Sequence, residues 1–167
     1  ALKKMTRSNF LSGVGGANTP AFMARRSDSQ GSVSDVTETK VLFPTQVFDV
    51  GSCYDESNSK FTVPSGEGGK YFLFCGANAY FYSTTGWQLN IHLYKNGSKL
   101  TTFSGYDYVS STQIVYGAQV QGQCMVELSA SDYIEVYIYG NTYNNGAFSI
   151  SGGDAFVTRF GGYKIIE

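Results

Sequence analysis

The chain has 167 residues, which is typical of one domain. Its net charge is −1, only 15% of its residues are charged, and it contains a single histidine, His92. Near-neutral charge argues against a surface that binds a nucleic-acid backbone. One histidine excludes a multi-histidine metal site within one chain. The longest apolar run, residues 71–75, is too short to cross a membrane.

The first eighteen residues differ from the rest. They contain Lys3, Lys4 and Arg7, no acidic residue, and a glycine-rich stretch at 13–16. This composition is typical of a flexible linker. We therefore expect residues 1–18 to connect a stalk to a single head domain formed by residues 19–167.

From residue 20 onward the patterning predicts strands. Leu89, Ile91 and Leu93 alternate with polar residues, and Asn96-Gly97 is a strong two-residue hairpin turn. Gly117 and Gly122 interrupt a long apolar segment and predict bulges or bends. The expected strands cover residues 21–26, 41–50, 60–63, 70–82, 87–94, 99–103, 114–128, 133–139 and 156–166. About ten short strands without helical periodicity predict an all-β, two-sheet sandwich.

The segment 70–82 is apolar on both faces. Tyr71, Leu73 and Cys75 alternate with Phe72 and Phe74. A strand that is apolar on both faces is buried on both. In a two-layer sandwich one of these faces needs a second partner, which is either a loop of the same chain or another copy. We favour another copy, since aromatic residues are enriched at such interfaces.

The three cysteines, Cys53, Cys75 and Cys124, are not spaced as a CxxC pair. An odd number leaves at least one free thiol or a bond between chains. Cys75 and Cys124 lie within expected strands. We therefore interpret these side chains as small buried apolar groups.

Several motifs resemble the complement C-one-q globular heads, a branch of the tumour-necrosis-factor jelly rolls. The stretch 20–25 is similar to their first strand, 93–97 to their central hairpin, and 160–163 to their closing strand. Ser131 stands where that family has glycine. The remaining matches are Phe43, Asp49, Tyr54, Phe61, Gly69-Lys70-Tyr71 and residues 128–132. Segments at 18–22, 47–49 and 53–55 are also similar to heads of marine tailed-phage structural proteins.

This resemblance implies a Greek-key jelly roll that assembles as a homotrimer around its inner sheet. By analogy Phe72 and Phe74 face the three-fold axis, and Tyr80, Tyr82 and Arg159 join the interface. Some heads of this family hold calcium near that axis. The acidic residues here lack EF-hand spacing, so we expect no cofactor and keep calcium as the alternative.

Evidence for catalysis is weak. His92 is the only available histidine base, and it lies on the polar side of an alternating strand, which predicts a surface residue. Glycoside cleavage needs two carboxylates at a fixed separation. The sequence offers Asp107, Asp132, Glu135 and Asp154 without placing them together. We therefore expect a protein that is not an enzyme, with a jelly-roll glycan hydrolase as the alternative.

Three segments combine tyrosine with small polar residues. Tyrosine offers a large contact area at low entropic cost, and asparagine adds adaptable hydrogen bonds. We expect ligand or receptor contacts from Tyr106, Asp107, Tyr108, Tyr143, Asn144 and Asn145. A tyrosine-rich strand surface without a ligand is the competing interpretation.

These observations predict a trimeric head at the end of an elongated assembly. We expect a virion (phage) structural or fibre protein that attaches to a host-surface glycan or protein, or to other virion proteins. The alternatives are a secreted, complement-like recognition head and a structural trimerising plug without a receptor. We expect no nucleic-acid partner and no membrane span.

Overall fold

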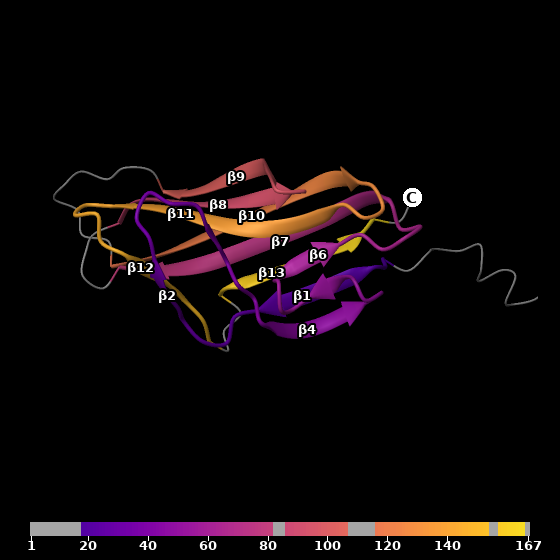
Figure 1. Cartoon of the computed structure of the whole chain (residues 1–167), viewed down its shortest axis with the longest axis horizontal. Coiled ribbons are helices and arrows are strands. Elements are labelled where there is room, and N and C mark those ends of the chain that lie inside the picture. The colour runs from indigo at the N-terminus through magenta and orange to yellow at the C-terminus, as the bar shows by residue number, and fades with distance from the viewer. Residues whose placement is uncertain (1–17, 82–85, 107–115, 154–156, 166–167) are drawn as a thin grey trace, which may run out of the picture.

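The computed structural model describes residues 18–81, 86–106, 116–153 and 157–165, and this part of the chain is all β, without a helix. None of these residues forms a helix long and apolar enough to cross a membrane. Two antiparallel sheets pack face to face (Figure 1). Sheet A runs in the order β2 (Gln30–Val33), β12 (Phe148–Ser151), β7 (Gly69–Tyr80), β13 (Arg159–Lys164), β1 (Ala21–Arg25) and β4 (Thr45–Val50), with β10 (Gly117–Leu128) also paired to β7. Sheet B runs in the order β5 (Tyr54–Asp55), β6 (Lys60–Thr62), β11 (Tyr133–Thr142), β8 (Gly86–Lys95) and β9 (Ser98–Tyr106), with β3 (Thr39–Lys40) also paired to β11.

The predicted two-sheet jelly roll is confirmed, and the long alternating segments all form strands. The expected strand at 41–50 is shorter, because β4 begins only at Thr45. Four short strands were not predicted: β2, β3, β5 and β12. Each has two to four residues, too few for a period to be visible.

The strands run along the length of the molecule, so its two ends differ. The start of β1 and the end of β13 lie at one end, which we call the base (Figure 1). The hydrogen bond from Lys164 N to Pro20 O joins the two terminal strands there. The opposite end, the tip, holds the end of β7 at Tyr80 and the turn between β11 and β12.

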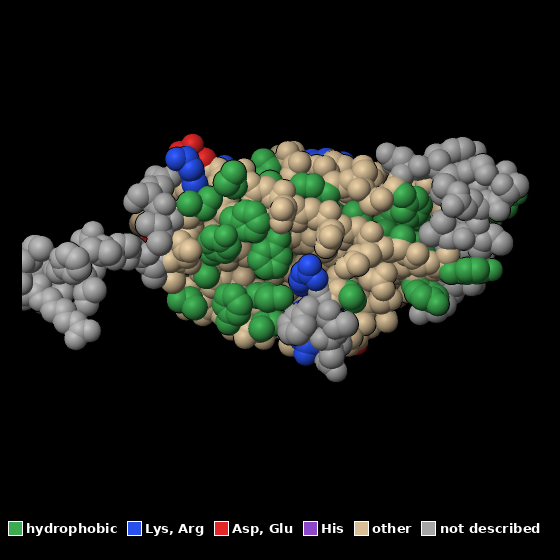
Figure 2. All heavy atoms as spheres, turned by 180° about the vertical axis from the view of Figure 1, so that it is seen from behind, with side chains coloured by type: hydrophobic (Ala, Val, Ile, Leu, Met, Phe, Trp, Pro, Cys, Tyr) green, Lys and Arg blue, Asp and Glu red, His purple; other side chains and the backbone are tan. Residues whose placement is uncertain are grey.

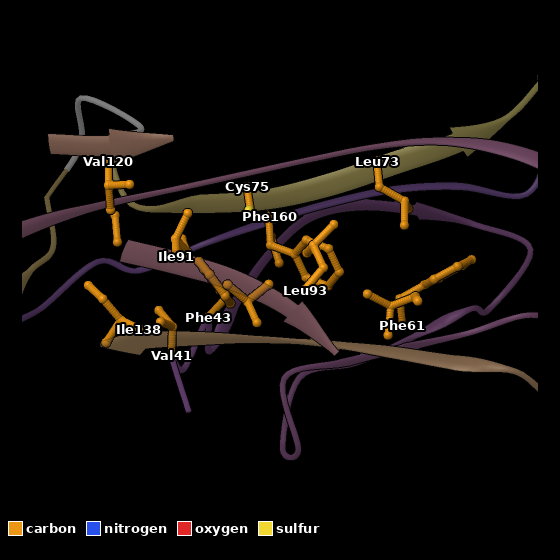
Figure 3. Close-up of a cluster of buried hydrophobic side chains, with 14 of the residues drawn as sticks. Val41, Phe43, Phe61, Leu73, Cys75, Ile91, Leu93, Val120, Ile138 and Phe160 are labelled. Atoms are coloured by element: carbon orange, nitrogen blue, oxygen red, sulfur yellow. The ribbon is translucent and has the colours of Figure 1, made fainter. Parts of the chain in front are cut away.

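The core lies between the sheets. Inward side chains of β7, including Leu73 and Cys75, meet those of β8, including Ile91 and Leu93 (Figure 3). Near the base the core is aromatic: the ring of Phe22 stacks on Phe61 at 4.7 Å between centroids and meets Phe160 edge-on at 4.9 Å. Offset and edge-on pairs of this kind add to the stabilisation from burial alone.

The bulges expected at Gly117 and Gly122 do not occur. β10 pairs with β7 from Gly117 to Leu128 without a shift in register. Gly122 has a packing role instead, because a Cβ there would overlap the ring of Phe103 from β9. The expected surface position of His92 is also wrong, since its side chain is 4% exposed.

The environment of His92 explains its burial. Its Nδ1 lies 2.9 Å from the hydroxyl of Thr102, and its Nε2 lies 3.9 Å from Glu38 Oε1. Glu38, just before β3, also pairs with Lys99 of β9. Burial and the nearby Lys99 lower the pKa of His92. The alternation placed His92 on the correct face of β8, but contacts from distant segments cover it.

We expect Gly122→Val to reduce the free energy of unfolding by about 1–3 kcal/mol, because the new side chain must displace the ring of Phe103. Urea unfolding at neutral pH measures this loss. Gly31→Ala is the control, since a Cβ there meets nothing within 4 Å. Equal stabilities for the Gly122→Val variant and the parent chain would contradict this packing.

Candidate functional site

The outer face of sheet A carries side chains that the core does not use. In β7, Tyr71, Leu73 and Cys75 point inward and are buried, whereas Phe72 and Phe74 point outward and are half-buried. The register of the five strands β10, β7, β13, β1 and β4 aligns their outward residues in rows across this face.

Of the rows that cross all five strands, the one nearest the base is entirely apolar, and beyond it toward the base β7 and β10 carry outward Lys70 and Glu127. The members of this apolar row are Met125, Phe72, Tyr163, Ala21 and Val50, one from each strand in order across the sheet. Met125 is 74% exposed and Val50 49%, and they stand at the two flanks. The rings of Phe72 and Tyr163 lie 5.5 Å apart at the centre. We call this set the first row.

The second row is Gln123, Phe74, Gly161, Met23 and Phe48. Gly161 leaves space at its centre, which the ring of Phe74 partly covers. An open hollow of about 730 Å³ begins here. Figure 2 shows hydrophobic side chains gathered over the half of one face nearer the base.

The third row is polar: Gln121, Gly76, Arg159, Arg25 and Thr45. Arg159 and Gln121 line the hollow on its tip side, while Phe72, Phe74 and Met23 line it on the base side. The face is therefore divided along the strands. Toward the base it carries one apolar row across the full width of the sheet and a second row that is apolar except for Gln123, and the third row toward the tip is polar.

Four of the predicted interface residues lie on this face. Phe72 and Phe74 belong to the first two rows, and Arg159 to the third. Tyr80 points outward at the tip end of β7 and is 41% exposed. Tyr82 lies outside the described residues. Alternation identified the β7 residues, whereas Met125, Phe48 and Val50 were missed because their rows appear only once β10 and β4 are placed at the flanks.

A second group of exposed aromatic side chains lies at the tip. Tyr143 is 58% exposed, and its ring meets Trp87 edge-on at 5.2 Å. Asn144 and Asn145 are exposed on the same turn. Thr142 fixes this turn: its hydroxyl donates to Gly146 O at 3.0 Å, and its N donates to Asp35 Oδ1 at 2.6 Å. A rigid turn therefore presents these three predicted contact residues.

Tyr106 is placed less favourably for ligand contact. Its ring packs against the core, its hydroxyl is buried, and burial raises its pKa to about 12. Asp107 and Tyr108 lie outside the described residues. Among the predicted contacts that are described, those on the 143–145 turn are the ones available to a partner.

Asp132 and Glu135, the two predicted glycosidase carboxylates within the described residues, are both engaged by other side chains. Asp132 accepts hydrogen bonds from Lys95, Asn96 and Ser129, which lower its pKa to about 2. A general acid needs a raised pKa instead. Glu135 pairs with Lys40 at 2.6 Å on sheet B. Asp107 and Asp154 fall outside the described residues.

The surroundings of His92 do not form a nucleophile–base site either. Thr102, His92 and Glu38 follow one another, as in a catalytic triad. However, the 3.9 Å between His92 and Glu38 exceeds a hydrogen bond, and Glu38 is engaged by Lys99. Burial also lowers the pKa of the histidine. These contacts indicate a structural role.

Within the described ranges, no group of three or more His, Cys, Asp or Glu side chains could hold a metal ion. The three thiols are not joined in disulfides: Cys53 and Cys75 are buried and Cys124 is half-buried. The pKa of each thiol is raised, and burial is the largest cause. A raised pKa lowers the thiolate fraction at neutral pH, and the thiolate is the form that acts as a nucleophile.

Solved structures identify the architecture. The globular domain of zebrafish complement 1qA protein is similar over 88% of this chain and 98% of its own, with a TM-score of 0.56 and 15% identity. Murine APRIL covers 87% of this chain at a TM-score of 0.60 and 13% identity, with 98% of its own chain matched. Eiger TNF from S. frugiperda covers 87% at a TM-score of 0.58 and 12% identity, with 91% of its own chain matched.

The chain has the jelly-roll fold of the complement and tumour-necrosis-factor heads. The similarity covers nearly all of the three solved domains. At 12–15% identity it establishes the fold alone. No family model matches the sequence, and no curated protein sequence matches it.

We expect Asp132→Asn to make the free energy of unfolding depend less steeply on pH under acidic conditions. Because the pKa of Asp132 is lowered in the folded chain, its contribution is present above about pH 4 and is lost as the pH falls toward 2. Denaturant midpoints measured between pH 7 and 2.5 should fall less steeply in this variant than in the parent chain.

Glu127→Gln, on the outward side of β10, is the control and should keep the parent chain's acid response. An unchanged slope in Asp132→Asn would show that the contacts of Asp132 at the base do not stabilise the fold.

Proposed function

We propose that this chain forms a homotrimeric, non-enzymatic binding head at the end of an elongated assembly. The observation that carries the proposal is the apolar first row on the outer face of sheet A, together with Phe74, Met23 and Phe48 of the second row. Met125, Phe48 and Val50 are each between 45% and 74% exposed in the single chain. A contiguous apolar patch of this kind is typical of a protein interface.

The fold supports a second copy as the occupant of this face. Complement and tumour-necrosis-factor heads pack three protomers around their inner sheet, which corresponds here to sheet A. The third row favours a three-fold arrangement over a face-to-face dimer. Two flat faces pressed together would remove the guanidinium groups of Arg25 and Arg159 from water, at a considerable desolvation cost. Around a three-fold axis, Arg159 instead faces the hollow that it lines.

The arrangement of the two ends supports a head that binds through its tip. Residue 18 is at the base, where residues 1–18 connect to the stalk in this proposal. The aromatic turn at 143–145 is at the opposite end, so a ligand can reach it while the base is attached. Loops on a rigid sandwich commonly carry recognition.

The setting that we propose is a virion, in which the head attaches a fibre to a host-surface glycan or protein or to other virion proteins. Its support is the sequence similarity to tailed-phage heads at residues 18–22, 47–49 and 53–55. Detecting this chain by mass spectrometry in purified particles tests the setting. Finding it only as a secreted protein would favour the complement-like alternative.

We expect Met125→Glu and Phe72→Glu to abolish the trimer at micromolar concentration, because each places three carboxylates in an apolar interface. Light scattering coupled to size exclusion measures the mass. Gln121→Glu, on the same face in the polar third row, is the matched control and should remain trimeric.

Unfolding midpoints separate loss of assembly from loss of folding. Met125 is the decisive position, since a side chain 74% exposed in the single chain contributes little to the monomer fold. A parent-like mass for both glutamate variants would refute this interface.

We expect Tyr143→Ser to weaken binding at least tenfold without changing the mass, because exposed aromatic side chains commonly dominate recognition. The probes are a panel of immobilised polysaccharides and intact host cells. Leu100→Ala on β9 is the control for loss of an exposed apolar side chain. Equal binding by both variants would contradict a binding site at the tip. Release of reducing sugar by the parent chain would favour the glycan hydrolase alternative.

A further inference from the structure

The outer face of sheet B contains a buried histidine that lacks one of its partners. His92 of β8 points away from the core side chains Ile91 and Leu93, yet its side chain is only 4% exposed. Its Nδ1 lies 2.9 Å from the Thr102 hydroxyl, whereas its Nε2 is buried and has no hydrogen-bond partner among the described residues. The contact at Nδ1 fixes the orientation of the ring and leaves Nε2 as the nitrogen that can gain a partner.

An ion pair crosses this face beside the histidine. Glu38, just before β3, pairs with Lys99 of β9, although β11 and β8 lie between these two segments. Glu38 Oε1, the oxygen that contacts Lys99, also lies 3.9 Å from His92 Nε2. That separation exceeds a hydrogen bond by about 1 Å. One carboxylate therefore stands within reach of two basic groups and contacts one of them.

The backbone on both sides of Glu38 is held along β11. Val36 N donates to Gly140 O at 2.8 Å, and Val41 N donates to Val136 O at 2.9 Å. Between these bonds, β3 pairs with β11 in the sheet. A change of partner by Glu38 therefore requires rotation of its own side chain and no movement of the strand.

The other titratable groups around His92 do not compete for its Nε2. At neighbouring positions of this face they are Lys40, Lys99, Glu135 and three tyrosines of β8 and β11. Lysines repel an imidazolium, and tyrosines are uncharged at neutral pH. Glu135 is engaged by Lys40 at 2.6 Å. Among the described residues, Glu38 is the only carboxylate within 4.0 Å of the histidine.

We propose that His92 is an acid-operated switch, in which protonation of Nε2 transfers Glu38 from Lys99 to His92. An imidazolium in this position needs an acceptor for its new N–H, because an unpaired buried charge is costly. Glu38 is that acceptor, since a shift of about 1 Å brings its oxygen into hydrogen-bond range. The proton comes from water, and no covalent bond between heavy atoms changes.

The same contacts set the pH range of the switch. Burial and Lys99 lower the pKa of His92 from its ordinary value of 6.5, and Glu38 opposes them. The exchange therefore occurs in mild acid, below pH 6.5. It opens the ion pair that links β9 to the segment before β3, and it frees the Lys99 ammonium on the surface. The switch is independent of the proposed trimer, because the apolar first row lies on the other sheet.

Nuclear magnetic resonance of the full chain tests the exchange, because the single histidine gives one unambiguous imidazole signal. The chain is deuterated except at Glu, Lys and His, and the Hε1 shift of His92 is followed from about pH 8 to about pH 4.5. Nuclear Overhauser cross-peaks are then recorded above and below the midpoint. Below it, the cross-peaks of Glu38 with Lys99 should weaken, and those of Glu38 with His92 should strengthen.

The matched control is the ion pair of Lys40 and Glu135 on the same face, whose cross-peaks should be equal on both sides of the midpoint. In His92→Gln, the cross-peaks of Glu38 with Lys99 should persist at both pH values. Lys99→Met should raise the titration midpoint of His92, because it removes a competing cation. Glu38→Gln should lower it, because the imidazolium loses its acceptor.

The parent chain alone can overturn the switch. Cross-peaks of Glu38 with Lys99 that persist on both sides of the His92 midpoint would refute the transfer. A midpoint below about pH 4.5 would also refute it, because the Glu38 carboxylate would then be protonated itself. A midpoint that does not fall in Glu38→Gln would show that Glu38 does not stabilise the imidazolium.

Discussion

The strand β7 has apolar side chains on both faces, and the rest of the structure depends on how both faces are buried. Tyr71, Leu73 and Cys75 fill the core between the sheets, and Phe72 and Phe74 point away from it. One sandwich can bury only the first set. The second set lies in the middle of sheet A, where the register joins it to apolar residues of four other strands. The surface is therefore a continuous feature of the sheet.

The same constraint explains why the two ends of the molecule differ. The apolar first row crosses sheet A near the base, and the third row, toward the tip, carries glutamine and arginine. Assembly at the base leaves the tip free for a partner. The tip presents Tyr143 on a turn that Thr142 and Asp35 hold in place. A rigid exposed aromatic side chain loses little conformational freedom on binding.

Much of the fold could be predicted from local patterns. Period-two alternation identified β8 and β11, because each keeps one face in the core over ten residues. The short strand β3 was missed because its partner is the distant strand β11. The strand β5 pairs with the nearby β6, but its two residues are too few to show a period. Ser131 shows a related limit. Its φ is 71°, in the left-handed region that favours glycine. This accounts for the glycine that the complement heads have at this position.

The candidate site could be predicted only in part. Phe72 and Phe74 are visible within one strand, but the rows that they join depend on the register of β10 and β4. The burial of His92 depends on Glu38 and Lys99, which come from two other segments of the chain. Such positions follow from pairing between strands, which a single sequence does not encode in any local pattern. The limited accessibility of Tyr106 could not be predicted for a similar reason, since its hydroxyl lies beside Gly86 of β8.

The most direct test of the central claim is the mass of the full chain in solution, by sedimentation equilibrium over a hundredfold range of concentration, with and without a chelator. The account predicts one species of three times the 18.2 kDa chain mass, because the apolar rows need partners. Chelator sensitivity would add an ion to that trimer. A single species of 18.2 kDa throughout the range would contradict the account, since the outer face of sheet A would then stand exposed to water.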